Sequence, residues 1–162
     1  MQLLISDANI LIDLHDGGLL PYMFNLPYEF ATPDILFMEE LASSHPNLVG
    51  LGLRLKTIQP EYMHYAFTLS DKHPKVSTND CLVLSLAKQE KCTLLTGDRR
   101  LVNVAEKEAV IVKGTIWLVE QMVKHNIITV DEAKVAYQQM ESAGSRLPFL
   151  EAHKRLNELL AN

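Results

Sequence analysis

The fold class of this chain follows from one stretch near its start, LLISDANILID at residues 3–13. The stretch begins with a short apolar run that stops before Asp7, a pattern typical of a buried parallel strand. Residues Ala8 to His15 then have the spacing of a helix, which Gly17-Gly18 ends. The stretch therefore predicts a strand that leads directly into a helix, with an aspartate at the junction.

The same alternation continues along the chain. We expect further strands at residues 29–31, 53–56, 93–96 and 110–112, the last of them stopped by Gly114. Strands that alternate with helices are typical of a parallel sheet with helices on both faces. The sequence therefore predicts an α/β fold in three layers, with a central parallel sheet of about five strands.

Three helices are expected between these strands. Thr32 and Pro33 predict a helix start, with Thr32 as the N-cap and Pro33 in the first helical position, and this helix would end near Ser43. A second helix is expected at residues 60–69, followed by a loop at residues 70–76. Ser77 or Thr78 would cap the third helix.

The chain from Thr115 to Asn162 has a helical pattern. Thr129 and Glu132 have the spacing of a capping box, and Gly144 would end the helix that they start. Leu147-Pro148 then opens a last amphipathic helix that reaches residue 160. Since no linker separates this tail from the rest, we expect one domain over residues 1–162, with a core at about 1–115 and a helical extension from about 115 to 162.

Composition narrows the function classes. The chain has 162 residues, of which 48% are hydrophobic, and a formal net charge of −5. The hydrophobic content argues against a disordered chain. The negative charge argues against a protein that only coats nucleic acid electrostatically, because such a protein needs a basic excess. Cys81 and Cys92 lack the spacing of a zinc finger, and no signal peptide or membrane-spanning run is recognisable, so we expect a reduced, cytoplasmic protein.

Four acidic residues are the candidate site. Asp7 and Asp98 each follow an apolar strand, and the carboxyl ends of parallel strands meet at one edge of a sheet, where ligands bind in open α/β folds. Asp80 lies in the first turn of a helix and Glu40 on the helix after the second strand, so both can reach that edge. Clustered carboxylates repel one another, and Mg²⁺ or Mn²⁺ relieves that repulsion while activating a water. The set predicts a divalent-metal site that cuts nucleic acid.

Each acid also has a purely local interpretation. Asp7 could only cap the following helix, and Ser77-x-x-Asp80 has the form of a capping box. Asp98 after Gly97 could be a turn residue, and Glu39 with Glu40 a solvated helix face. The basic residues beside Asp98, Arg99 and Arg100 with Lys88 and Lys91, could be a solvated surface or could hold phosphates.

The chain resembles the PIN-domain family in four ordered pieces. These are LISDANILID at 4–13, Glu40-Leu41, STND at 77–80 with Leu86-Ala87, and LLTGDRRL at 94–101. The resemblance covers residues 1 to about 115 and implies a PIN fold and Mg²⁺- or Mn²⁺-dependent cleavage of single-stranded RNA. By position it implies that the catalytic, metal-binding residues are Asp7, Glu40, Asp80 and Asp98, with Thr96 in support and Arg99 and Arg100 at the RNA.

The resemblance also implies partners. Many small members of the family are toxins neutralised by an antitoxin, so a toxin component, often a homodimer, is one expectation. Some relatives carry a further aspartate where Arg99, Arg100 and Leu101 stand here, which bears on the number of metal ions. The tail is longer than in the shortest toxins, and its Arg146-Leu147-Pro148 resembles less characterised bacterial members. Glu40 is preferred to Glu39 because a leucine follows it as in the family pattern.

Two other function classes stay open. A catalytically weak PIN scaffold would bind RNA or a protein, and it would show no metal-linked rise in melting temperature. A phosphotransfer module of the receiver type expects paired acids near the first strand and a lysine after the last. Lys113 follows Val112, but Asp7 has no adjacent acid.

Overall fold

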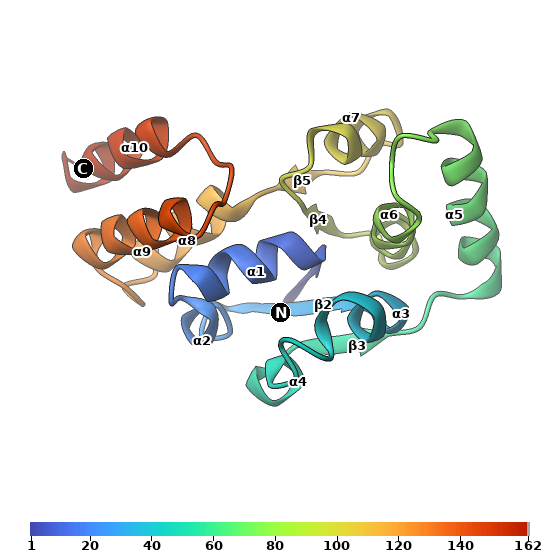
Figure 1. Cartoon of the computed structure of the whole chain (residues 1–162), viewed down its shortest axis with the longest axis horizontal. Helices are drawn as coiled ribbons and strands as arrows, with labels where there is room; N and C mark the ends of the chain where they lie inside the picture. The colour runs from blue at the N-terminus through green and yellow to red at the C-terminus, as the bar shows by residue number, and fades with distance from the viewer. Residues whose placement is uncertain (162) are drawn as a thin grey trace.

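A sheet of five parallel strands forms the middle layer of the computed structural model, which describes residues 1–161 (Figure 1). The strands are β1 (Gln2–Ser6), β2 (Tyr28–Pro33), β3 (Arg54–Lys56), β4 (Thr93–Leu95) and β5 (Val112–Lys113). Their order across the sheet is β3-β2-β1-β4-β5, and every neighbouring pair runs parallel. This sheet confirms the predicted α/β class.

Helices cover both faces of the sheet. They are α1 (Ala8–Asp16), α2 (Leu20–Met23), α3 (Asp34–Leu36), the π-helical turn η1 (Phe37–Leu41), α4 (Leu48–Leu51), α5 (Pro60–Lys72), α6 (Thr78–Glu90), α7 (Arg99–Lys107), α8 (Thr115–Lys124), α9 (Val130–Ser142) and α10 (Phe149–Ala161). Figure 1 shows α5, α6 and α7 on one side of the sheet and α1, α8, α9 and α10 on the other. The layers are therefore helix, sheet and helix, as predicted.

The order of the strands reverses direction at the centre of the sheet. From β1 the chain adds β2 and β3 on one side, then crosses to add β4 and β5 on the other. Parallel sheets bind ligands in the crevice outside the strand ends at such a reversal. Here the reversal lies between β1 and β4, whose ends lead into Asp7 and Asp98.

The core makes these strand ends rigid. Leu4 and Ile5 of β1 and Leu94 and Leu95 of β4 are 0% exposed. Helix α6 packs against β1, β2 and β4 and also contacts α5 and α7, so the whole run Cys81–Ala87 is buried. A helix that is enclosed on all sides holds its first turn in a fixed position relative to the sheet.

The predicted helix start at Thr32 and Pro33 is wrong. Both residues belong to β2, and the helix begins at Asp34 with Pro33 as its N-cap. The buried Thr32 hydroxyl donates to the carbonyl oxygen of Ser6 at 3.0 Å, and Thr32 pairs in register with Leu55. The residue before a proline favours extended backbone, which here lengthens the strand.

Other boundaries differ by a few residues. The predicted loop at 70–76 begins later, because residues 70–72 continue α5, and the fifth strand is Val112–Lys113 instead of 110–112. In the tail, Thr129 and Glu132 form the predicted reciprocal capping box. Gly144 follows α9 with φ of +98°, in the left-handed region that favours glycine. Asn162 lies outside the described residues.

The cysteines behave as apolar residues. Cys81 is buried, Cys92 is half-buried, and both are free thiols. Burial raises the pKa of each thiol to about 11, so neither is a reactive thiolate at neutral pH. Within residues 1–161, no helix has the length and apolar character needed to cross a bilayer.

Candidate metal-binding active site

Asp7 is a buried carboxylate at the end of β1, with 3% of the residue exposed. Its backbone N–H donates to the carbonyl oxygen of Leu95 at 3.0 Å, so the ends of β1 and β4 lie side by side. Oδ1 accepts from the N–H of Ile10 at 3.0 Å, and Oδ2 accepts from Thr96 Oγ1 at 2.5 Å. Asp7 therefore does cap α1, but this role occupies only one of its two oxygens.

Burial makes the charge of Asp7 costly. Removal from water raises the pKa of Asp7 from 3.8 to about 7, although the hydrogen bonds from Thr96 and Ile10 oppose the shift. The charges of Asp80 and Asp13 raise that pKa further. A carboxylate in this position is partly protonated near neutral pH, and a cation beside it would restore the charged form.

Thr96 connects Asp7 to the next acid. Its hydroxyl donates to Asp7 and accepts from the N–H of Asp98 at 3.2 Å. Asp98 caps α7, because its Oδ1 accepts from the N–H of Leu101 at 3.1 Å. One threonine thus fixes the side chain of Asp7 and the backbone of Asp98 at the same place.

Asp80 lies in the first turn of α6, near the other acids. The Ser77 hydroxyl oxygen accepts from the N–H of Asp80 at 3.1 Å, so half of the predicted local capping arrangement exists. Burial raises the pKa of Asp80, and the charges of Asp98 and Glu40 raise it further. Asp80 therefore lies within electrostatic reach of Asp98 and Glu40, as it does of Asp7.

Glu40 is directed by the π-helical turn η1. A π turn holds one more residue than an α turn, changes where its side chains point, and is frequent at functional sites. Glu40 Oε1 accepts from Asn79 Nδ2 at 2.9 Å, which holds Glu40 next to the first turn of α6. Glu39 instead lines an adjacent depression with apolar side chains of α3 and α5. Of the two glutamates, Glu40 is the one beside Asp80.

Three helices begin at this site. Asp7 and Asp98 are the N-caps of α1 and α7, and Asp80 lies in the first turn of α6. Helix N-termini carry partial positive charge and unpaired N–H groups, which favour carboxylates and phosphates. The local interpretation of these acids as caps and the functional interpretation are therefore compatible.

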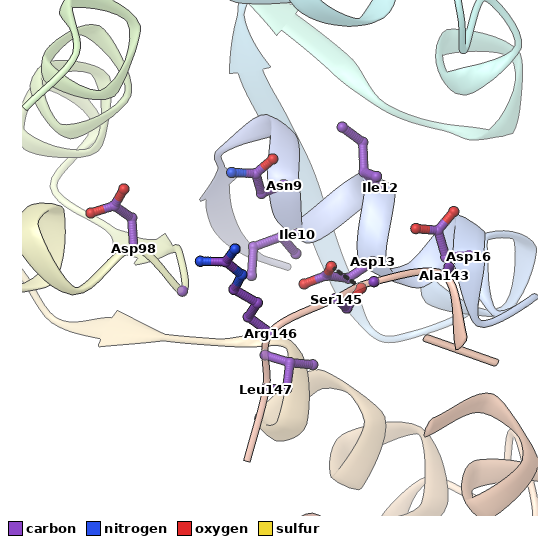
Figure 2. A pocket seen from close by; sticks show the side chains of 12 residues that line it. Asn9, Ile10, Ile12, Asp13, Asp16, Asp98, Ala143, Ser145, Arg146 and Leu147 are labelled. Atoms are coloured by element: carbon purple, nitrogen blue, oxygen red, sulfur yellow. Dashed lines mark hydrogen bonds between the residues drawn. The ribbon is translucent and has the colours of Figure 1, made fainter. Parts of the chain in front are cut away.

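A pocket of about 390 Å³ opens beside Asp98. Its walls are one face of α1 from Asn9 to Asp16, the turn between β4 and α7, and the loop between α9 and α10. Figure 2 shows Asp98 and Asp13 on different sides of this pocket, with the side chain of Arg146 reaching toward it from the loop. The pocket thus extends the acidic strand ends toward the helical tail.

Asp13 is a residue of this pocket that the sequence reasoning did not single out. Its carboxylate accepts from Thr115 Oγ1 at 3.1 Å and from Ser145 Oγ at 2.7 Å. Burial raises the pKa of Asp13, and the charge of Asp16 raises it further, whereas these two hydrogen bonds lower it. A signal was present, because Asp13 interrupts the apolar run ILIDL of α1 at a position that faces other elements.

A family model described as DUF3368, PIN domain, matches residues 3–160. The chain belongs to the PIN-domain family. PIN domains are typically nucleases and commonly bind divalent metal ions. No protein among those curated matches the sequence. The family match confirms the resemblance and agrees with the sheet and its helical layers.

The acids of this PIN domain offer the oxygen donors that Mg²⁺ and Mn²⁺ prefer. In the part of the chain that the structure describes, no three carboxylate, histidine or cysteine side chains are already gathered closely enough to hold a metal ion. Mg²⁺ needs no such cage, because it keeps several waters and takes one or two carboxylates together with substrate phosphates. These acids therefore fit a metal ion whose coordination shell is completed by water and by substrate oxygens.

The predicted RNA contacts lie outside the pocket of the PIN domain. Arg99 and Arg100 are exposed in the first turn of α7, and no acid within residues 1–161 forms an ion pair with either. The arginine that lines the pocket is Arg146. Contact of Arg99 and Arg100 with RNA stays a prediction.

Proposed function

We propose that this protein is a divalent-metal-dependent endoribonuclease that hydrolyses phosphodiester bonds of single-stranded RNA. The observation that carries the proposal is the buried Asp7 at the reversal of strand order, within electrostatic reach of Asp80. Buried like charges are expensive, and a divalent cation is the simplest compensation. Family membership supports nuclease chemistry, and the resemblance to RNA-cleaving members supports RNA.

In this proposal Asp7, Asp80, Asp98 and Glu40 would hold the metal, one or two of them directly and the others through its bound waters. A divalent ion there supplies charge neutralisation at the scissile phosphate and an acidified water. Thr96 keeps Asp7 oriented through its hydroxyl hydrogen bond. The N-termini of α1, α6 and α7 add positive potential toward a phosphate, since each begins at the site. The pocket beside Asp98 leaves room for a strand to approach.

The test is cleavage of an end-labelled single-stranded RNA with Mn²⁺ by wild type and Asp98→Asn. Asparagine can still cap α7, so the variant should fold while losing one charge at the metal. We expect the cleavage rate to fall by about 100-fold or more, on the scale of lost electrostatic stabilisation of a transition state.

Asp71→Asn is the matched control, because Asp71 is an exposed acid in the last turn of α5 and does not line the pocket beside Asp98. It should cut like wild type. Equal cutting by Asp98→Asn and wild type would remove Asp98 from the site. A clean wild type that cuts no RNA with Mn²⁺ would remove the proposed activity.

A binding scaffold is the second candidate. The observation in its favour is that no three acids within residues 1–161 are already gathered around a metal position. The two candidates differ in one measurable property: the scaffold needs no metal to hold its partner, and Mn²⁺ should leave its thermal stability unchanged.

A further inference from the structure

The loop between α9 and α10 supplies the third wall of the pocket beside Asp98. Ala143 to Leu147 all line that pocket. Arg146 is exposed, and Figure 2 shows its guanidinium directed toward the pocket between Asp98 and Asp13. In the described chain, no acid lies within ion-pair distance of Arg146. Its guanidinium therefore has donors to offer to a ligand.

The loop that carries Arg146 is fastened at both ends. Gly144 makes the turn with φ of +98°, and the Ser145 N–H donates to the carbonyl oxygen of Met140 at 3.0 Å. The Ser145 hydroxyl donates to Asp13 Oδ1 at 2.7 Å, which ties the loop to α1. On the other side, Phe149 is buried in the core. Arg146 thus extends from a backbone held at a fixed distance from α1.

The charge around Arg146 is otherwise negative. Asp13, Asp16 and Asp98 line the same pocket. A nucleic-acid strand that enters an acidic pocket must bring its phosphates past these carboxylates, which repel them. A guanidinium binds phosphate oxygens through two parallel N–H donors and always carries its charge. Among the residues that line this pocket, Arg146 is the one cationic side chain, and it is therefore the side chain best suited to hold a phosphate.

We propose that Arg146 binds a phosphate of the single-stranded RNA that flanks the scissile one, and so positions the strand across the pocket toward Asp98. This inference rests on the proposed function for its substrate. It assigns a binding role to the helical tail, which otherwise packs on α1 through α8 and α9.

The test compares Arg146→Gln, Arg146→Lys and Lys154→Gln in the RNA cleavage assay with Mn²⁺. A flanking contact that is equal in ground and transition states raises KM and leaves kcat unchanged. For Arg146→Gln we expect a KM increase of about ten-fold, the scale of one charge-assisted hydrogen-bonded contact. Arg146→Lys should give a smaller increase, because an ammonium keeps the charge and loses the paired donors.

The salt dependence of KM gives a second readout. The slope of log KM against log salt concentration should be smaller by about 0.7 in Arg146→Gln than in wild type, because one phosphate contact is lost.

Lys154→Gln is the matched control, since it removes one exposed positive charge from α10 outside the pocket. It should leave KM unchanged. An unchanged KM in Arg146→Gln would overturn the proposal while the nuclease function stands. An equal KM increase in both glutamine variants would also overturn it, because general charge would then explain the effect.

If the wild type cuts no RNA, fluorescence anisotropy with the same labelled RNA separates the two proposals. Weaker binding by Arg146→Gln than by Lys154→Gln would keep Arg146 as a phosphate-binding residue without the nuclease. Equal binding, or none by any form of the protein, would remove both. If Arg146→Gln lowered thermal stability and left RNA binding unaltered, Arg146 would be a counter-ion for Asp13 and Asp16. That result would also contradict the proposal.

Discussion

The carboxylate of Asp7 accepts hydrogen bonds from α1 and from Thr96 while being almost fully removed from water. These bonds offset only part of the cost of its charge, since its pKa is still raised to about 7. In the absence of metal, Asp7 should therefore destabilise the folded protein at alkaline pH. A residue that lowers stability at a strand end is typical of a functional site.

Asp7→Asn should stabilise the metal-free protein increasingly as pH rises. The raised pKa means that the neutral carboxyl group favours the folded state below pH 3.8, and this contribution is lost as pH rises through about 7. Asparagine stays neutral and can still cap α1. The free energy of unfolding of the variant relative to wild type should increase by about 3–4 kcal/mol between pH 4 and pH 8. Urea unfolding in EDTA at several pH values measures this difference.

Asp71→Asn serves as the control for that experiment, because Asp71 is exposed. Its unfolding curve should follow that of wild type across the whole range. If the free energies of unfolding of Asp7→Asn and wild type instead changed in parallel with pH, the pKa of Asp7 would not be raised in the folded state, and the prediction would be wrong.

Thr96→Val should weaken metal binding without removing a ligand. The substitution keeps the shape of the side chain and removes the hydroxyl that donates to Asp7 and accepts from the Asp98 N–H. Partners of metal ligands typically contribute ten-fold or more to affinity, so we expect Mn²⁺ affinity to fall by about ten-fold. Calorimetric titration measures it. Thr96→Ser keeps the hydroxyl and should bind Mn²⁺ like wild type; the same loss in both variants would point to packing of the threonine methyl group.

At the scale of elements, α10 packs on α9 through buried apolar residues, and one ion pair also joins it to α8. Arg155 donates from Nε and from a terminal nitrogen to the two oxygens of Glu120, at 2.6 and 2.8 Å. Glu120 is 3% exposed, whereas half of the Arg155 side chain is in solvent. The pair adds to the apolar packing that positions α10 and the loop that leads into it.

Arg155→Ala should leave the buried Glu120 carboxylate without its partner. Removing one member of a buried pair is strongly destabilising, but the exposed half of Arg155 lets water reach the acid, so we expect a loss of roughly 2 kcal/mol. Thermal unfolding measures the change. Lys154→Ala, the adjacent exposed cation, should change stability by less than about 0.5 kcal/mol. Equal effects of the two substitutions would show that the ion pair contributes nothing beyond surface charge.

The boundaries of the elements show where pairing within the sheet overrides a local sequence motif. Thr32-Pro33 has the composition of a helix start, yet the hydroxyl bond to Ser6 and the pairing with β3 extend β2 through both residues. Asp80 shows the opposite case, since the Ser77 hydroxyl does cap its N–H and the carboxylate still lies within electrostatic reach of Asp98 and Glu40. A local motif determines the secondary structure of a segment only where that segment does not pair with a neighbouring strand.

Over the whole molecule, the central sheet could be predicted because its apolar runs are short and each ends in a polar residue. The positions of Asp7 and Asp98 followed from that rule alone, since parallel strands share an edge. The contribution of the tail could not be predicted in this way. Ser145 contacts Asp13 across 132 residues of sequence, and no periodicity or capping pattern encodes such a contact. Arg146 was visible in the sequence, but its place beside Asp98 depends on how α9 packs on α1.

The most direct measurement of the central claim is the change in melting temperature of wild type and Asp7→Asn on titration with Mn²⁺ at pH 8. Binding to the folded state at about 100 times Kd adds ~2.7 kcal/mol, which is a rise of about 5–10 °C for a protein of this size. We predict that rise in wild type and no rise in Asp7→Asn, whatever the difference between their metal-free melting temperatures. A wild-type melting temperature that does not respond to Mn²⁺, or an equal rise in both proteins, would contradict a metal site built on Asp7.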